Sequence, residues 1–145
     1  MAAPINDYKK NDWKVGDKFG MHVIPEAAAN GPIFYNLFQM AHYVYPDLAV
    51  IDGYEGMEGN GPTGGTSIAS RMAIASLDAL AADTVGATVM GFDPDKIPYL
   101  KFLNQGGFGQ GSINDIEIIG TPITQCIMKF RPSDDSIKVF RDVYN

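Results

Sequence analysis

The stretch Ile51–Thr66, IDGYEGMEGNGPTGGT, constrains the fold more than any other part of the chain because it is so rich in glycine. Six glycines lie between Gly53 and Gly65. Glycine adopts positive φ and admits other groups close to its backbone, but it loses more conformational freedom on folding than any other residue. A short apolar segment typical of a buried strand, Leu48–Ile51, comes first. We therefore predict a glycine-rich loop after a strand: a functional loop on a rigid scaffold, or else a long turn or a domain-packing loop.

Acidic residues lie within this stretch and at the start of the next helix. Carboxylates and backbone carbonyls are the ligands that Mg²⁺ and Ca²⁺ prefer. The pattern predicts a divalent-cation site, although the spacing does not match the calcium helix-loop-helix motif. Two alternatives stay open: a general acid–base pair, or solvated glutamates beside an aspartate that binds turn amides. The candidate metal ligands are Asp52, Glu55, Glu58, Asp78 and Asp83.

The centre of the stretch, GNGPTGG (Gly59–Gly65), offers clustered backbone amides that can bind an anion. No lysine follows the glycines, so the segment is not a P-loop. The nearby carboxylates oppose a phosphate unless a cation bridges the two charges. The candidate ligand-binding residues are Asn60, Gly61, Thr63, Gly64 and Gly65.

The remaining periodicity predicts an α/β fold, with a mixed sheet of about four to five strands flanked by two to three helices. Residues 1–30 are interpreted as an N-terminal arm or partial segment, and residues 31–145 as a single α/β domain. Ser76 or Asp78 is expected to cap the second helix, and Gly91 to end it. The expected helices are 31–45, 79–90 and 95–103, and the expected strands are 48–51, 70–76, 116–119 and 124–130.

The net charge of −6 argues against nucleic acid and against anionic membrane surfaces, since both attract basic patches. The chain has neither a signal peptide nor an apolar run long enough to span a bilayer, so we expect a cytoplasmic protein. Cys126 is the single cysteine and is expected to be a buried thiol. An iron–sulfur cluster needs about four ligands, which excludes a cluster within this chain.

Two motifs carry a family resemblance. DGYEGMEGNGPTGG, followed by SLDALAADTVGATVMGFDP, resembles the family domain of unknown function 362 over Tyr45–Gly120. The family has no settled activity. Its members are usually longer, with a preceding α/β half, and some carry ferredoxin-type cysteines. The resemblance therefore implies that this chain is the C-terminal portion of a longer protein. Its partner would be a missing N-terminal half or a ferredoxin-like domain.

Two functions follow from these observations. The first is a cation-dependent small-ligand-binding or enzyme-like domain centred on the acidic glycine-rich stretch. The second is a non-catalytic module of a larger iron–sulfur or redox protein, in which the same stretch is an interdomain contact. Converging carboxylates favour the first, and an exposed apolar patch favours the second. A domain that lacks its other half is also expected to self-associate. The sequence identifies no substrate.

Overall fold

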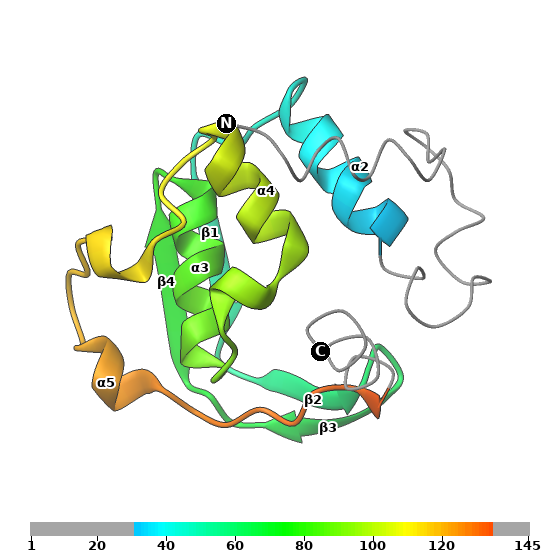
Figure 1. The fold of residues 1–145 in the computed structure, drawn as a ribbon. Coiled ribbons are helices and arrows are strands. Elements are labelled where there is room, and N and C mark those ends of the chain that lie inside the picture. Colours follow the sequence, from blue (N-terminus) through cyan, green and yellow to red (C-terminus); the bar gives the residue numbers. More distant parts are fainter. Residues whose placement is uncertain (1–30, 135–145) are drawn as a thin grey trace.

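A computed structural model describes residues 31–134 as a mixed α/β structure (Figure 1). The expected N-terminal arm, residues 1–30, lies outside the described residues. The elements in chain order are α2 (Gly31–Ala41), β1 (Ala49–Gly53), β2 (Gly56–Asn60), β3 (Gly64–Ile68), β4 (Met72–Ser76), α3 (Ala79–Val89), the 3₁₀ helix η2 (Pro94–Lys96), α4 (Pro98–Gly106), the 3₁₀ helix η3 (Ile113–Asp115) and α5 (Ile123–Cys126).

The four strands form one long hairpin that is bent in the middle. β1 pairs antiparallel with β4, and β2 pairs antiparallel with β3. Between the two ribbons, residues 54–55 lie opposite residues 69–71, so the returning chain carries one extra residue. Arg71 takes a positive φ of 52° there and donates its N–H to the Tyr54 carbonyl at 2.9 Å. An extra residue in one strand bends the ribbon, and Figure 1 shows β2–β3 turned away from β1–β4.

The predicted glycine-rich loop is therefore wrong for most of its length, because β2 and β3 are strands. Only residues 61–63 remain as the turn between them. Glycine has low strand propensity, so sequence patterns favour a loop, but packing against the partner strand outweighs that preference. An added Cβ at Gly65 would lie 2.7 Å from the Glu58 carbonyl oxygen, so this strand position accepts no side chain without a shift.

Helix α3 covers one face of the β1–β4 ribbon, and α4 packs against α2 and α3 (Figure 1). The predicted capping of α3 is confirmed: Asp78 is its N-cap, and Gly91 follows its C-terminus at φ 83°. Helix α2 ends at Ala41, earlier than predicted. Aromatic and aliphatic side chains from α2, α3 and α4 form the buried core, which comprises Phe38, Leu80, Ala87, Leu100, Phe102 and Leu103.

The described residues contain two separate two-stranded sheets in place of the predicted four- to five-stranded sheet. The strands predicted at 116–119 and 124–130 are not formed. Residues 116–122 are irregular, and α5 occupies part of the second segment. Met128 and Phe130 donate their N–H groups to the carbonyls of Val89 and Met90, at 2.7 and 3.0 Å. This segment is therefore bound to the end of a helix, not to a neighbouring strand.

No helix within residues 31–134 is long and apolar enough to cross a lipid bilayer.

Candidate functional site

The three acidic residues of the glycine-rich stretch each bind a nearby donor. An Asp52 carboxylate oxygen accepts the Tyr54 N–H at 3.0 Å, as the turn-binding alternative predicted. Glu55 accepts the hydroxyl of Ser67 on the paired strand. Glu58 accepts the backbone N–H of Arg131 at 2.8 Å. Each contact holds the hairpin or the segment that crosses it, so these carboxylates have structural partners.

The two candidate carboxylates at the start of α3 also accept hydrogen bonds. Asp78 is the N-cap, and Asp83 lies in the second turn. Asp78 accepts the N–H of Ala81 with one oxygen at 3.0 Å and that of Gln110 with the other at 2.7 Å. Asp83 accepts the Tyr99 hydroxyl at 3.0 Å and so joins α3 to α4. Burial raises the pKa of Asp83, and the Tyr99 hydrogen bond partly offsets this. Burial and the Asp83 charge both raise the pKa of Tyr99.

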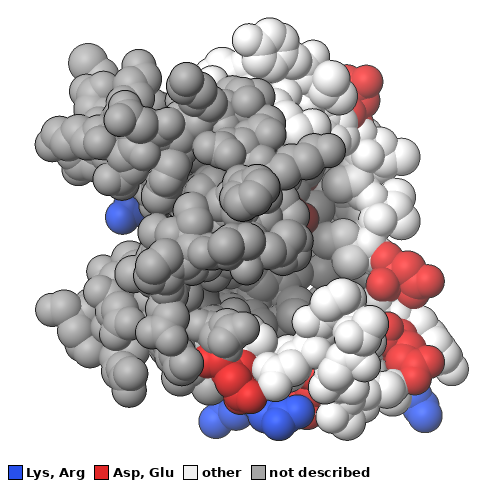
Figure 2. Space-filling model, turned by 90° about the vertical axis from the view of Figure 1, so that its right-hand side faces the viewer, with Lys and Arg blue, Asp and Glu red and all other residues white. Residues whose placement is uncertain are grey.

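The carboxylates do not gather around a common point. Among residues 31–134, no three side chains of His, Cys, Asp or Glu lie close enough together to hold a metal ion. On the face of the molecule in Figure 2, acidic side chains lie at several separate places. The described geometry thus supplies a local structural role for each carboxylate that the sequence proposed as a metal ligand.

The tip of the hairpin binds a segment that lies far away in sequence. Asn60 donates its side-chain amide to Asp134 at 2.8 Å and accepts the Asp134 N–H at 2.9 Å. The Gly59 N–H donates to the Arg131 carbonyl at 2.8 Å, and the Gly61 N–H donates to the Gly59 carbonyl at 3.0 Å. Asn60 and the amide of Gly61, both proposed as ligand-binding groups, are therefore hydrogen-bonded within the protein. The other three proposed residues follow in the turn and at the start of β3: Thr63, Gly64 and Gly65.

Residues 128–131 connect α3 to the hairpin, a role that the sequence analysis missed. Phe130 is buried beneath β2, where an added Cβ at Gly56 would lie 2.9 Å from its ring. Gly59, at φ 78°, faces the Arg131 guanidinium. A signal was present in the sequence, where apolar and basic residues alternate over Met128–Arg131, but we predicted a strand over 124–130 there. These contacts explain two of the six glycines by close packing.

The outer face of the β1–β4 ribbon is largely apolar, and its side chains are exposed. The antiparallel register sets Val50 beside Ala75 and Asp52 beside Ala73, all exposed. Continuing the same register by one more pair sets Leu48 beside Leu77, and these two side chains are 58% and 82% exposed. Antiparallel sheets with one solvated face usually carry polar residues on that face. Here five of the six positions are apolar.

Comparison with known proteins identifies the family. A family model described as Domain of unknown function (DUF362) matches residues 7–88, more than half of the chain. The chain belongs to this family. No curated protein and no solved structure matches it. The match covers all four strands and most of α3, whereas residues 89–120 of the resemblance described above lie beyond it. Membership confirms the family resemblance and assigns no activity.

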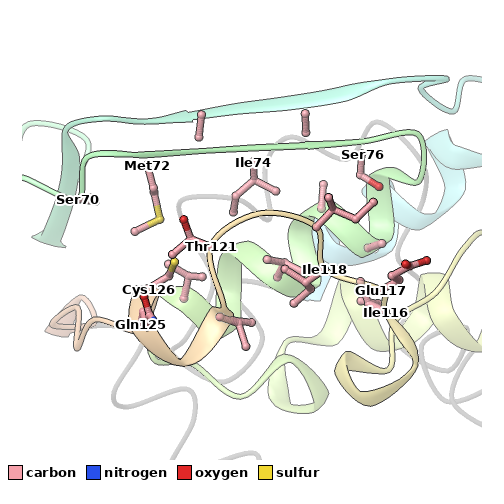
Figure 3. Close-up of a pocket in the computed structure, with 18 of the residues that line it drawn as sticks. Ser70, Met72, Ile74, Ser76, Ile116, Glu117, Ile118, Thr121, Gln125 and Cys126 are labelled. Carbon is pink, nitrogen blue, oxygen red and sulfur yellow. The ribbon is translucent and has the colours of Figure 1, made fainter.

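Beside the outer edge of β4 lies a cavity of about 690 Å³. Met72 and Ile74 of β4 point toward residues 116–126, which form the opposite side (Figure 3). Small side chains of α3, Ala81 and Ala82, contribute to its lining. The DUF362 match includes the β4 and α3 walls and leaves out the wall formed by residues 116–128. Cys126, expected to be buried, is a half-buried free thiol in that wall.

Proposed function

We propose that this domain is a non-catalytic interaction module that binds another protein domain through the outer face of its β1–β4 ribbon. One observation carries the proposal: Val50 is well exposed on the outer face of the ribbon, and Leu48 and Leu77, which directly flank the paired strands, are well exposed too. An α/β domain normally covers both faces of its sheet, because each face buries apolar side chains. Covering this face would remove that apolar surface from water, which is the main driving force for association.

The family resemblance motivates a finer proposal about the partner. Longer relatives combine such a domain with a preceding α/β half and, in some cases, with a ferredoxin-type region. We therefore propose that the covering domain belongs to a larger iron–sulfur or redox protein. The glycine hairpin then serves as a structural arm, because its carboxylates and its tip are already hydrogen-bonded within the domain.

Self-association of the isolated full-length chain tests the role of the sheet face. Light scattering and sedimentation over a range of protein concentrations should show concentration-dependent association, since the bare apolar faces are free to bind each other. The double variant Val50→Lys, Leu77→Lys should abolish it. Tyr43→Lys changes a residue that is 83% exposed in the turn after α2 and should leave association unchanged. A wild-type chain that stays monomeric at high concentration would count against the proposal.

A cation titration tests the competing function. The chain is transferred to metal-free buffer and then titrated with Mg²⁺, Ca²⁺ and Fe²⁺, beside an Asp52→Asn, Glu58→Gln variant. We expect no stoichiometric binding to either protein, because the described carboxylates have no common centre. Stoichiometric binding that the variant loses would overturn the interaction module in favour of a cation-dependent site on the hairpin.

A further inference from the structure

We infer that the outer edge of β4 accepts one extended strand of another polypeptide, whose inward-facing side chains fill the 690 Å³ cavity. The inference rests on the proposed function and deepens it by naming how the partner binds. A strand added here would widen the β1–β4 ribbon and continue its apolar outer face onto the partner.

The first observation is the open edge itself. β1 occupies one edge of β4, and within the described residues no backbone hydrogen bond joins the other edge to residues 116–128. An exposed strand edge is a template for pairing, and proteins usually protect such an edge with charges, proline or a covering segment. β4, MAIAS, contains neither a charged residue nor proline. The outer edge of β4 therefore lacks the residues that usually prevent a further strand from pairing with it.

The second observation is the cavity on the helix side of that edge. Successive side chains of a strand point to opposite faces of the sheet. A strand beside β4 would therefore direct every second side chain into the space between β4, α3 and residues 116–126 (Figure 3). Met72, Ile74 and Val85 contribute apolar walls to this space, so the strand needs apolar residues at its inward positions.

The third observation is a segment with strand character that has no neighbouring strand among residues 31–134. Residues 116–119, Ile-Glu-Ile-Ile, are rich in a β-branched residue, and strand formation was predicted from that composition. In the structure they form no strand, and Ile119 is 90% exposed. These residues line the same cavity as β4. A strand entering from a partner would supply the missing neighbour on this side as well.

The charges at the two ends of β4 define the polarity of the incoming strand. Arg71 immediately precedes β4, whereas Glu117 lies at the Ser76 end (Figure 3). Neither side chain forms an ion pair with another described residue. Antiparallel pairing is slightly more stable per residue than parallel pairing. The complementary strand therefore begins with a basic residue beside Glu117 and ends with an acidic residue beside Arg71.

A single strand fits this position better than the β4 strand of a second copy. The inward side chains of β4 already pack toward α3, so a second β4 would bring its own α3 to the same side of the sheet. Residues 116–126 of the first copy already occupy that side (Figure 3). A lone extended segment carries no helix layer and needs only the cavity.

The experiment measures backbone amide hydrogen exchange in the full-length chain with a short end-blocked peptide. The peptide starts with lysine, ends with aspartate and alternates valine with threonine between them. At about ten times its Kd, exchange of alternate amides in 72–76 should slow about tenfold, because only the free form exchanges readily. The same peptide methylated on alternate backbone nitrogens keeps the side chains but loses the donors, and it should give no protection.

Charge variants test the polarity. Glu117→Lys should lower the affinity for this peptide by up to about fivefold, which is the range expected for an exposed ion pair. The same variant should raise the affinity for the charge-reversed peptide. Asp95→Lys makes the same change of charge on η2 and should alter neither affinity.

Three results would overturn the inference. Equal protection by the methylated peptide would show that side chains alone drive binding. Protection of β4 without peptide that grows with protein concentration would assign the edge to a second copy. No protection at millimolar peptide would exclude strand addition. That last failure leaves the proposed function standing if Val50→Lys, Leu77→Lys still abolishes self-association, so the two failures are distinguishable.

Discussion

The β2–β3 hairpin and the β1–β4 ribbon are parts of one continuous hairpin, yet they are stabilised in different ways. β1–β4 packs on α3, and the adjoining helices bury Leu80 and Phe38 almost completely. β2–β3 has little buried apolar surface, and hydrogen bonds to residues 131 and 134 hold it in place. Its glycines permit close contact between backbones. A motif dense in glycine can therefore specify a precise structural arm.

The largest predicted effect is a difference in stability loss when an apolar side chain is truncated in the helical core and in the β2–β3 hairpin. Leu80→Ala, at a position 1% exposed, should lower the free energy of unfolding by about 2–5 kcal/mol through lost burial and a new cavity. Met57→Ala in β2, at a position 49% exposed, should cost less than about 1 kcal/mol. Urea unfolding followed by circular dichroism measures both. Equal costs would show that the hairpin carries as much of the core as α3 does.

A substitution that adds only a methyl group should destabilise the hairpin where a glycine of one strand lies against the backbone of the other. Gly65→Ala should destabilise the protein by about 1–3 kcal/mol, since the new Cβ would meet the Glu58 carbonyl oxygen. Gly61→Ala is the control, because its nearest neighbour is the flexible Met57 sulfur at 3.3 Å. Thermal unfolding of the two variants gives the comparison. A Gly65→Ala variant as stable as Gly61→Ala would refute the close-packing explanation.

The Asp78 cap is expected to contribute stability to the ribbon–helix unit. Asp78→Ala should cost about 1–2 kcal/mol, because the N–H of Ala81 loses its capping acceptor. Asp78→Asn keeps one acceptor oxygen and should cost less. Urea midpoints of the two variants, with magnesium present and absent, show whether the carboxylate acts as a cap. A magnesium-dependent difference would instead restore Asp78 as a metal ligand.

Replacing the buried Thr84 hydroxyl should raise stability. Thr84 is fully buried, and its hydroxyl oxygen has no hydrogen-bond partner among residues 31–134. Thr84→Val removes an unsatisfied polar group and keeps the shape of the side chain, so we expect a gain of about 1 kcal/mol. Thr88→Val is the matched control, since its hydroxyl donates to the Thr84 carbonyl at 2.8 Å. A loss of stability in Thr84→Val would indicate a partner for this hydroxyl.

The smallest effect should be a pH dependence that arises from Asp83. The folded protein holds the Asp83 proton to higher pH than the unfolded chain, so the stability falls as the pH rises from about 4 through the raised pKa. Asp83→Asn removes this titration and still accepts the Tyr99 hydroxyl. The variant should therefore gain stability relative to wild type at neutral pH and lose that advantage below pH 4. Thermal unfolding from pH 3 to pH 8 measures the difference, and parallel curves would contradict it.

Sequence alone determined the features that depend on local chemistry. The α3 helix, its Asp78 cap and its Gly91 terminus follow from residue types at fixed spacing. The α/β class and the family follow from periodicity and from a distinctive motif. The Asp52 turn contact was also anticipated as an alternative, because aspartate commonly accepts the amide two residues later.

Only the tertiary structure decided the path of the glycine-rich stretch and the partners of its carboxylates. Strand pairing is a long-range interaction, so local propensity alone predicted a loop where β2 and β3 pair. Conversely, local propensity predicted a strand at 116–119, where the described residues place no strand alongside. Glu58 and Asn60 bind residues more than 70 positions away, and no sequence spacing encodes such contacts. A strand needs a neighbour, and only the folded chain shows which edges have one.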